Sequence, residues 1–316
     1  MNLKKALPMF LIALFAIILA ACSDTTTSPA VDTRTPGKPD SAMATTTNDS
    51  TINLKWKASI DENDTAFVGY IVKMTGDNGT TAIDTVSKHF NPLKVTGLNA
   101  GVIYTFEISS LFKNGNSSAS TVISWSPAYR FTKSAEGASS IKLYETTSKL
   151  GSGIDAYDSN LKGPKTLTVA NGEFWTLGLD TRNDKVIIAS PSLINYNYPS
   201  TPGYTEISQD YWDTPSLDVI YDSQALNYNE NKFSPLSINL NDSTISISNN
   251  LVLSIRTNLV LIIRTKESGE NDWHYAKVMI KKVNGEWLQG NSPNRYVEVE
   301  ISYQTKANVP YAKRHL

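Results

Sequence analysis

The side chains that could do chemistry in this chain of 316 residues are few and scattered. Its histidines are His89, His274 and His315, and its one cysteine is Cys22. Serine catalysis needs a histidine base that an acid positions, and a single central histidine gives little basis for it. There is also no glycine-rich phosphate loop and no metal-ligand spacing of His, Cys and Asp. The sequence therefore predicts no enzymatic activity and no metal site.

Paired carboxylates are the remaining catalytic pattern, because two of them can act as acid and base on a glycosidic bond. Asp210 and Asp213 lie near Trp212, and Glu270 and Asp272 lie further along the chain. Both pairs occur in polar segments that resemble turns, where acidic side chains are usually solvated. We therefore interpret them as surface residues.

His274 is the candidate imidazole for ligand binding in the C-terminal half. It lies near the start of a predicted strand from Trp273 to Val283 and shares its apolar face with Ala276, Val278 and Ile280. Tyr275 follows it directly. A histidine in this position is either a ligand or a structural residue of the apolar face, and the sequence leaves both interpretations open.

A second candidate surface lies between Ala189 and Phe233, where Asn, Tyr, Pro and Asp dominate and the chain is predicted to be irregular. Long irregular loops are often functional or disordered, and so many aromatic rings do not fit disorder. The rings either form a binding surface or cover the open ends of a sandwich. The candidate ligand-binding residues are therefore His274, Tyr275, Tyr198, Tyr204, Tyr211 and Trp212.

Cys22 ends an N-terminal segment with the features of an export signal. Lys4 and Lys5 precede an apolar stretch, residues 6–21, that is shorter than the roughly 20 residues of a membrane-spanning helix. The run Leu19-Ala20-Ala21-Cys22 resembles the lipobox of bacterial lipoproteins. This resemblance implies that residues 1–21 are a signal peptide and that Cys22 is lipidated and becomes the new N-terminus.

The chain after Cys22 carries 27 basic and 30 acidic residues, because Lys4 and Lys5 leave with the signal peptide. No clustered basic face is apparent, so we do not expect a nucleic-acid partner. Residues 22–35 contain no aromatic side chain and are too polar to bury a core, which predicts a flexible tether. The remaining length suggests two domains.

Short alternating segments between turn residues predict an antiparallel sandwich over residues 36–132. The landmarks of this segment resemble the fibronectin type III module, which has a tryptophan on the second strand, a tyrosine on the third and a tyrosine corner. They are Pro39, Trp56, Tyr70, Gly97-Leu98, Tyr104 and Gly115-Asn116-Ser117-Ser118. The resemblance implies that these side chains are structural, with Trp56, Tyr70 and Leu98 in the core and the Tyr104 hydroxyl bonded to nearby backbone.

Residues 133–140 are small and polar and are predicted to be a linker to a second domain, residues 141–316. Strand patterns recur there, for example at Phe174–Leu179 and in a last strand whose Val297, Val299, Ile301 and Tyr303 share the buried face, and Asn284-Gly285 predicts a tight hairpin turn. Residues 250–257 and 258–265 form an octapeptide repeat with one difference. We interpret this repeat by default as a gene duplication, and the sequence leaves open whether it has a function.

Three short motifs of this second domain resemble those of the HmuY-like haem-binding lipoproteins. They are Ile262-Ile263-Arg264-Thr265, Tyr275-Ala276-Lys277-Val278 and Val299-Glu300-Ile301-Ser302-Tyr303-Gln304. The resemblance implies capture of haem, often through a pair of histidines. This chain departs from that pattern, because His274 is the one plausible imidazole in the domain, and Thr176 stands where the family has an aspartate.

The sequence thus predicts an all-β chain in which a fibronectin type III sandwich precedes a larger antiparallel β domain. The first functional hypothesis is a lipid-anchored binding protein of the cell envelope, at the outer membrane or cell surface, that captures haem or another small ligand. The second is a structural or adhesive surface lipoprotein that contacts proteins or glycans. An apolar pocket at His274 would favour the first, and an open aromatic platform at residues 196–212 the second.

Overall fold

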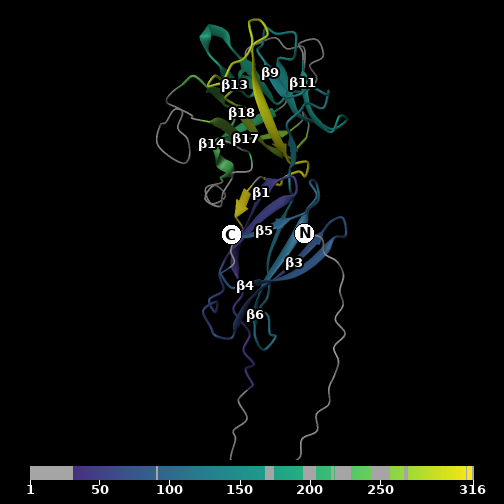
Figure 1. The fold of residues 1–316 in the computed structure, drawn as a ribbon, viewed down its shortest axis with the longest axis vertical. Coiled ribbons are helices and arrows are strands. Elements are labelled where there is room, and N and C mark those ends of the chain that lie inside the picture. The colour runs from purple at the N-terminus through teal and green to yellow at the C-terminus, as the bar shows by residue number, and fades with distance from the viewer. Residues whose placement is uncertain are drawn as a thin grey trace, which may run out of the picture. The chain divides into compact units, whose positions relative to one another are not determined.

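The computed structural model describes most of the chain after the N-terminal segment (Figure 1). The described residues are 31–89, 92–167, 174–194, 204–214, 217, 229–242, 257–266, 270–310 and 312–314. The chain divides into two compact units, Met1–Thr33 and Arg34–Leu316. Within the described residues, no helix is long and apolar enough to cross a membrane. Cys22, Tyr198, His315 and nearly all of the first octapeptide copy lie outside the described residues.

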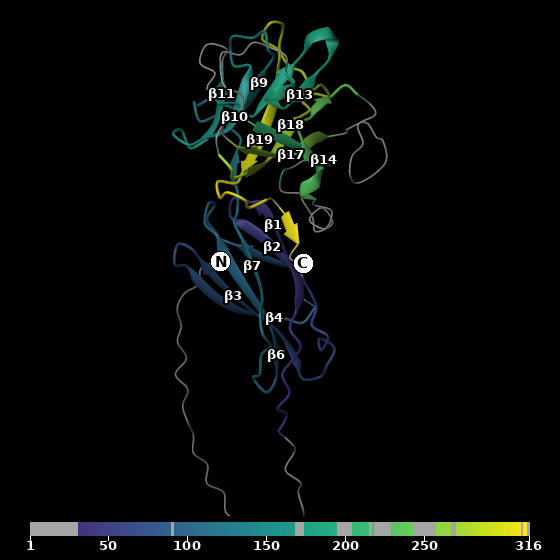
Figure 2. The ribbon, with the colours of Figure 1, turned by 180° about the vertical axis from the view of Figure 1, so that it is seen from behind.

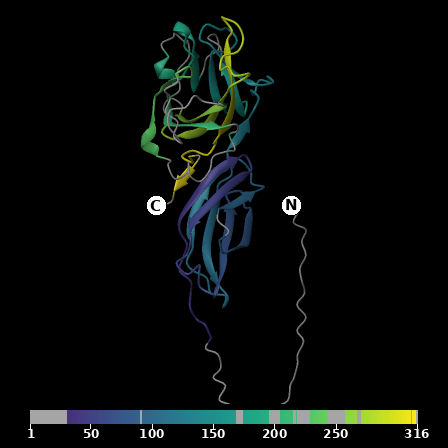
Figure 3. The same ribbon diagram turned by 60° about the vertical axis from the view of Figure 1, so that its left-hand side comes forward.

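The N-terminal sandwich has seven strands in two antiparallel sheets. Its strands are β1 (Asp40–Asn48), β2 (Thr51–Lys57), β3 (Phe67–Gly76), β4 (Thr81–Ser87), β5 (Leu93–Thr96), β6 (Tyr104–Phe112) and β7 (Thr121–Trp125). One sheet has the order β1-β2-β5 and the other β4-β3-β6-β7. The purple β1 and β2 lie against the blue strands of the second sheet (Figure 3).

Strict alternation explains this sandwich, because every second side chain of β6 is buried from Tyr104 to Phe112. The predicted core residues Trp56, Tyr70 and Leu98 are 2%, 1% and 5% exposed, and the two rings pack edge to face. The Tyr104 hydroxyl accepts a hydrogen bond of 2.9 Å from the Asn99 backbone N–H. The predicted tyrosine corner is therefore confirmed.

The rest of the chain, apart from its last strand, which joins the sandwich, forms two larger antiparallel sheets (Figure 2). The strands are β8 (Tyr129–Phe131), β9 (Ile141–Tyr144), β10 (Gly153–Asp158), β11 (Gly163–Leu167), β12 (Leu177–Asp180), β13 (Ile187–Ala189), β14 (Tyr204–Thr214), β15 (Phe233–Ser234), β16 (Ser237–Asn239), β17 (Asn258–Lys266), β18 (His274–Lys281), β19 (Tyr296–Tyr303) and β20 (Ala312–Arg314). One sheet has the order β11-β10-β12-β13-β16. The other has the order β15-β14-β17-β18-β19-β8, with β9 also paired to β19. The predicted all-β fold is therefore confirmed for the described residues.

A shared apolar core joins these two sheets. It contains Ile154 and Leu179 from the five-stranded sheet and Leu261, Val278 and Ile301 from the seven-stranded sheet. Strands β17 and β18 are buried on both faces, because Val260, Ile262, Tyr275 and Met279 form a second cluster on the other side. Strands that are buried on both faces have continuous apolar sequences, and the run from Leu259 to Ile263 is an example.

Strands also pair across the boundary between the sandwich and the C-terminal sheets. Strand β8 follows β7 directly and pairs with β19, with Phe131 opposite Ile301. Strand β20 returns to the sandwich and pairs with β1, beside which it is drawn in yellow (Figure 1). Lys277 of β18 is 1% exposed, and its Nζ donates to the backbone oxygens of Thr46 and Leu217 at 3.2 and 3.1 Å.

Two local expectations differ from the structure. The segment predicted to be irregular contains the eleven-residue strand β14, whose backbone pairs with β17 even though its own sequence is polar and aromatic. The strand predicted at Phe174–Leu179 begins instead at Leu177, and just before it both the backbone N–H and the hydroxyl of Thr176 donate to the Ile154 backbone oxygen. The predicted Asn284-Gly285 turn is present, with both residues at positive φ.

Candidate functional site

His274 lies at the first position of β18, opposite Thr265 of β17. As predicted, it has the strand parity of Ala276 and Val278, which belong to the core between the sheets. Its ring stacks on Tyr303 with 5.9 Å between ring centroids and 14° between planes. Its Nδ1 lies 3.2 Å from the Gln304 backbone oxygen. The imidazole is therefore held in one orientation.

Tyr157 completes a stack of three rings that we call the aromatic stack: Tyr157, Tyr303 and His274. Tyr157 and Tyr303 are nearly parallel, with centroids 4.8 Å apart and planes at 7°. Tyr157 lies where the pairing of β10 with β11 shifts between Asp155 and Asp158. An irregularity of this kind re-aims side chains, which places Tyr157 against the inner face of β19. Strand β8 supports the stack, because the ring centroids of Phe131 and Tyr157 lie 6.1 Å apart.

The aromatic stack lines an open cavity of about 310 Å³, which we call the His274 cleft. Its other lining residues are Ser159, Phe174, Thr265, Lys266, Glu270 and Thr305. Most of these side chains are polar, and they come from segments far apart in the sequence. The cleft therefore combines aromatic rings with several hydrogen-bonding groups, and it is more polar than the apolar pocket that was expected from the sequence as the sign of small-ligand capture.

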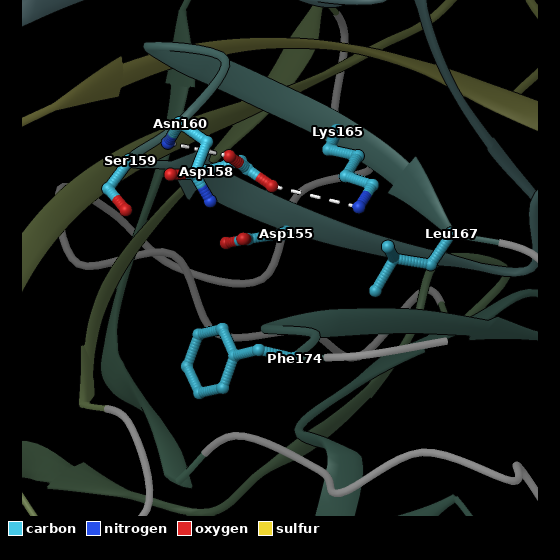
Figure 4. Close-up of a pocket in the computed structure, with 7 residues that line it drawn as sticks. All are labelled: Asp155, Asp158, Ser159, Asn160, Lys165, Leu167 and Phe174. Atoms are coloured by element: carbon cyan, nitrogen blue, oxygen red, sulfur yellow. Dashed lines mark hydrogen bonds and ion pairs between the residues drawn. The ribbon is translucent and has the colours of Figure 1, made fainter. Parts of the chain in front are cut away.

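A second cavity of about 310 Å³ adjoins the His274 cleft and shares Ser159 and Phe174 with it. We call it the Asp158 hollow. It is lined by Asp155, Asp158, Ser159, Asn160, Lys165, Leu167 and Phe174. Figure 4 shows the Phe174 ring on one side of this space and Asp155, Asp158 and Ser159 on the other.

The Asp158 carboxylate is fixed by its own turn. Its Oδ1 accepts hydrogen bonds from the backbone N–H groups of Asn160 and Leu161 at 2.8 and 2.9 Å. Its Oδ2 lies 3.7 Å from the Lys165 Nζ, which is longer than a direct hydrogen bond (Figure 4). The Asp158 carboxylate is therefore fixed, with the Lys165 ammonium beside it.

Tyr275 does not join His274 in the cleft, contrary to the expectation that both serve one ligand. Neighbouring residues of a strand point to opposite faces, and Tyr275 packs into the second cluster at 4% exposure. Its hydroxyl lies 3.1 Å from both carboxylate oxygens of Glu230. Burial, together with the Glu230 charge, raises the pKa of Tyr275 to about 12.

Arg264 holds the neighbourhood of Tyr275 together. Its guanidinium pairs with Glu206 at 2.5 Å and with Glu230 at 2.9 Å. It also lies over the rings of Phe233 and Trp273, at 4.9 and 4.4 Å from their centroids. Burial opposes the charge, but the two carboxylates outweigh it and raise the pKa of Arg264 further. These partners give Arg264 a structural role.

Tyr204 is the one predicted site residue of β14 whose side chain the structure describes. It is 45% exposed and lies 5.6 Å from the Trp273 ring at a tilt of 43°. The Lys266 Nζ lies 5.5 Å from the Tyr204 centroid and 4.9 Å from that of Trp273. Because Lys266 also lines the His274 cleft, this aromatic pair borders the cleft.

The other predicted site residues are placed only in part. Tyr211 and Trp212 lie on β14 opposite Leu261 and Val260, and the structure does not describe their side chains. Tyr198 and Cys22 lie outside the described residues. Among the described residues, no group of three or more His, Cys, Asp or Glu is placed to hold a metal ion.

Comparison with known proteins identifies the N-terminal part. A family model of the fibronectin type III domain matches residues 37–126. This part of the chain is therefore a fibronectin type III domain, as its landmarks predicted. The match ends before β8, which pairs within the C-terminal sheet.

Several solved structures similar to this chain are fibronectin type III domains or segments. One is the FN5 domain of Drosophila Lar, with 23% identity over 29% of this chain and 97% of that chain, and a TM-score of 0.23. Another is a domain of human collagen XX, with 18% identity over 31% and 99%, and a TM-score of 0.24. A two-domain segment of chicken tenascin has 11% identity over 77% and 99%, and a TM-score of 0.27. No curated protein matches the chain.

Proposed function

We propose that this chain is a cell-envelope binding protein, anchored by a lipid at Cys22, whose C-terminal domain captures a small ligand in the His274 cleft. The observation that carries the proposal is the aromatic stack in an open cavity, beside polar groups from separate strands. The lipobox resemblance supports the anchor and a location at the outer membrane or cell surface. The fibronectin type III domain, a module typical of surface proteins, agrees with this location.

Haem, the ligand that the HmuY-like resemblance implies, fits this cleft poorly. Tyrosine can ligate haem iron, but Tyr275 faces away from the cleft and its raised pKa keeps it protonated. His274 is the one imidazole among the described residues of the cleft, and the two tyrosines that line it, Tyr157 and Tyr303, are stacked with each other and with His274. The mainly polar lining also suits a polar ligand better than an apolar macrocycle. We therefore favour another small ligand over haem.

A ligand screen on residues 23–316 tests the proposal. Thermal shift would be measured with haem, flavins, nucleosides, amino acids and oligosaccharides, for the native sequence and for His274→Ala. We expect at least one compound to raise the melting temperature of the native sequence and to lose this effect in the variant, because only binding to the folded state stabilises it. A screen in which no compound has a His274-dependent effect would contradict ligand capture.

An adhesive or structural surface role is the second candidate, and two observations favour it. Fibronectin type III domains typically serve such roles, and the exposed Tyr204 with Trp273 forms an aromatic pair beside the cleft. An empty ligand screen, together with binding to a surface glycan polymer or protein that Tyr204→Ala abolishes, would favour this role over ligand capture.

A further inference from the structure

The Asp158 hollow and the His274 cleft together suit one chemical class of ligand. The hollow contributes the carboxylates of Asp155 and Asp158 and the ammonium of Lys165. The cleft contributes Lys266 and Glu270. Three carboxylates and two ammonium groups nearly balance, so neither an anion such as a phosphate nor a strongly cationic ligand is favoured. The lining instead offers many hydrogen-bond acceptors and donors to a neutral molecule.

Asp158 and Lys165 form a long ion pair in the hollow. Their charged atoms stand 3.7 Å apart, too far for a direct hydrogen bond. A ligand hydroxyl at this position would accept a hydrogen bond from Lys165 and donate one to Asp158. Because backbone N–H groups already fix Oδ1 of Asp158, the carboxylate needs no rearrangement to accept that bond.

Phe174 supplies the complementary apolar contact. Its ring lines both cavities and stands across the Asp158 hollow from the carboxylates (Figure 4). A molecule between them would meet hydrogen-bonding groups on one side and an aromatic ring on the other. A sugar ring matches this arrangement, because it carries hydroxyls at its edge and C–H groups on its face, which pack on aromatic rings.

We infer that the joined Asp158 hollow and His274 cleft bind a neutral saccharide, with Asp158 and Lys165 holding one hydroxyl and Phe174 stacking on the sugar face. The inference rests on the proposed function and names its ligand class. Each cavity has about 310 Å³, near the small end of ligand pockets, which suits a short oligosaccharide.

The test is calorimetric titration of residues 23–316 with maltotriose, cellotriose, mannotriose and chitotriose. The cleft variants are Asp158→Asn, which keeps the acceptor for the backbone bonds, and Phe174→Ala. We expect one trisaccharide to bind one-to-one and each variant to weaken its Kd about tenfold or more, the loss typical of a charged hydrogen bond or a stacked ring. The matched control is Asp84→Asn, an exposed carboxylate on β4 that should leave Kd unchanged.

Two results would overturn the inference: no trisaccharide binds, or binding occurs but neither cleft variant changes it. Phe174→Tyr is the control for misfolding of the alanine variant, because it keeps the aromatic ring and should retain binding. The ligand screen separates this failure from that of the proposed function. A His274-dependent ligand of another class would leave ligand capture standing and remove only the saccharide assignment.

Discussion

At the scale of single residues, the structure separates side chains that stabilise the fold from those that line the cleft. Trp56, Tyr70 and Tyr104 are structural, as their positions in the fibronectin type III pattern predicted. The face of His274 was also predictable, because strand alternation fixes it. The positions of Tyr157 and Phe174 were not predictable from the sequence. The register shift in β10 sets the direction of the Tyr157 side chain. Phe174 reaches the cleft only through tertiary contacts with residues distant in the sequence.

Tyr104→Phe is expected to destabilise the chain, because the Asn99 N–H then loses its acceptor. The expected loss is about 1–2 kcal/mol of unfolding free energy, as for other hydrogen bonds left unmade. Urea unfolding measures it as a lower midpoint at an unchanged m value. Tyr129→Phe, at a site 38% exposed, is the control and should change the midpoint little. Equal urea midpoints for the native sequence and Tyr104→Phe would contradict the stabilising role of the tyrosine corner.

Glu145 is the clearest source of acid sensitivity. It is 1% exposed and forms bonds with the Arg295 guanidinium at 2.8 and 3.0 Å and with the Thr181 hydroxyl. Burial alone would raise the pKa of Glu145, but these hydrogen bonds outweigh it and hold the pKa below its usual 4.5. The stabilisation is therefore present above pH 4.5 and is lost as pH falls through the folded-state pKa.

Glu145→Gln should lower the unfolding free energy at pH 7 by about 3 kcal/mol, because it leaves Arg295 without its charged partner. The difference from the native sequence should shrink as the pH is lowered below 4.5. Urea unfolding at stepwise lower pH measures both effects, with the exposed Glu286→Gln as control. A difference that stays constant over this pH range would contradict the assignment.

At the scale of elements, sequence patterns predicted those strands that have one buried face and one more exposed face. Strands β2, β6 and β19 alternate clearly and lie close to their predicted positions. Strand β14 was missed, because its polar and aromatic sequence does not alternate and its pairing with β17 is a tertiary contact. Turns that contain glycine could be predicted from the sequence, as Asn284-Gly285 shows.

Gly285→Ala tests that turn. Gly285 has φ +86°, and no atom lies within 4 Å of an added Cβ, so the cost is backbone strain alone. We expect a loss of about 1–2 kcal/mol of unfolding free energy, because a side chain disfavours positive φ. Gly285→Asn is the matched comparison and should cost less, since asparagine tolerates this region. Equal stability of the alanine variant and the native sequence would contradict the expected backbone strain of a side chain at this positive φ.

At the scale of the whole molecule, the sandwich and the C-terminal sheets share strands and buried contacts. Residues 34–316 form one compact unit. Strand β8 completes the edge of β19 and supports the aromatic stack through Phe131. No local pattern predicted these links, because three residues of β8 and three of β20 carry no periodicity of their own.

Two fragments test the contribution of β8. Residues 127–316 keep this strand, whereas residues 138–316 lack it. We expect the shorter fragment to be less stable or to aggregate, because it exposes an unpaired edge of β19 and part of the core. Thermal unfolding followed by near-ultraviolet circular dichroism measures the difference. Equal melting temperatures would show that residues 141–316 fold without the preceding strand.

The measurement that tests ligand capture most directly is the backbone amide NMR spectrum of residues 23–316, titrated with the compounds that pass the thermal screen. The residues that line the cleft are Tyr157, Ser159, Phe174, Thr265, Lys266, Glu270, His274, Tyr303 and Thr305. The proposed function predicts saturable shifts at these residues, and for a saccharide also at Asp155, Asp158 and Lys165 of the adjoining hollow. Shifts on the strands of the fibronectin type III domain, or no shifts with any compound, would contradict it.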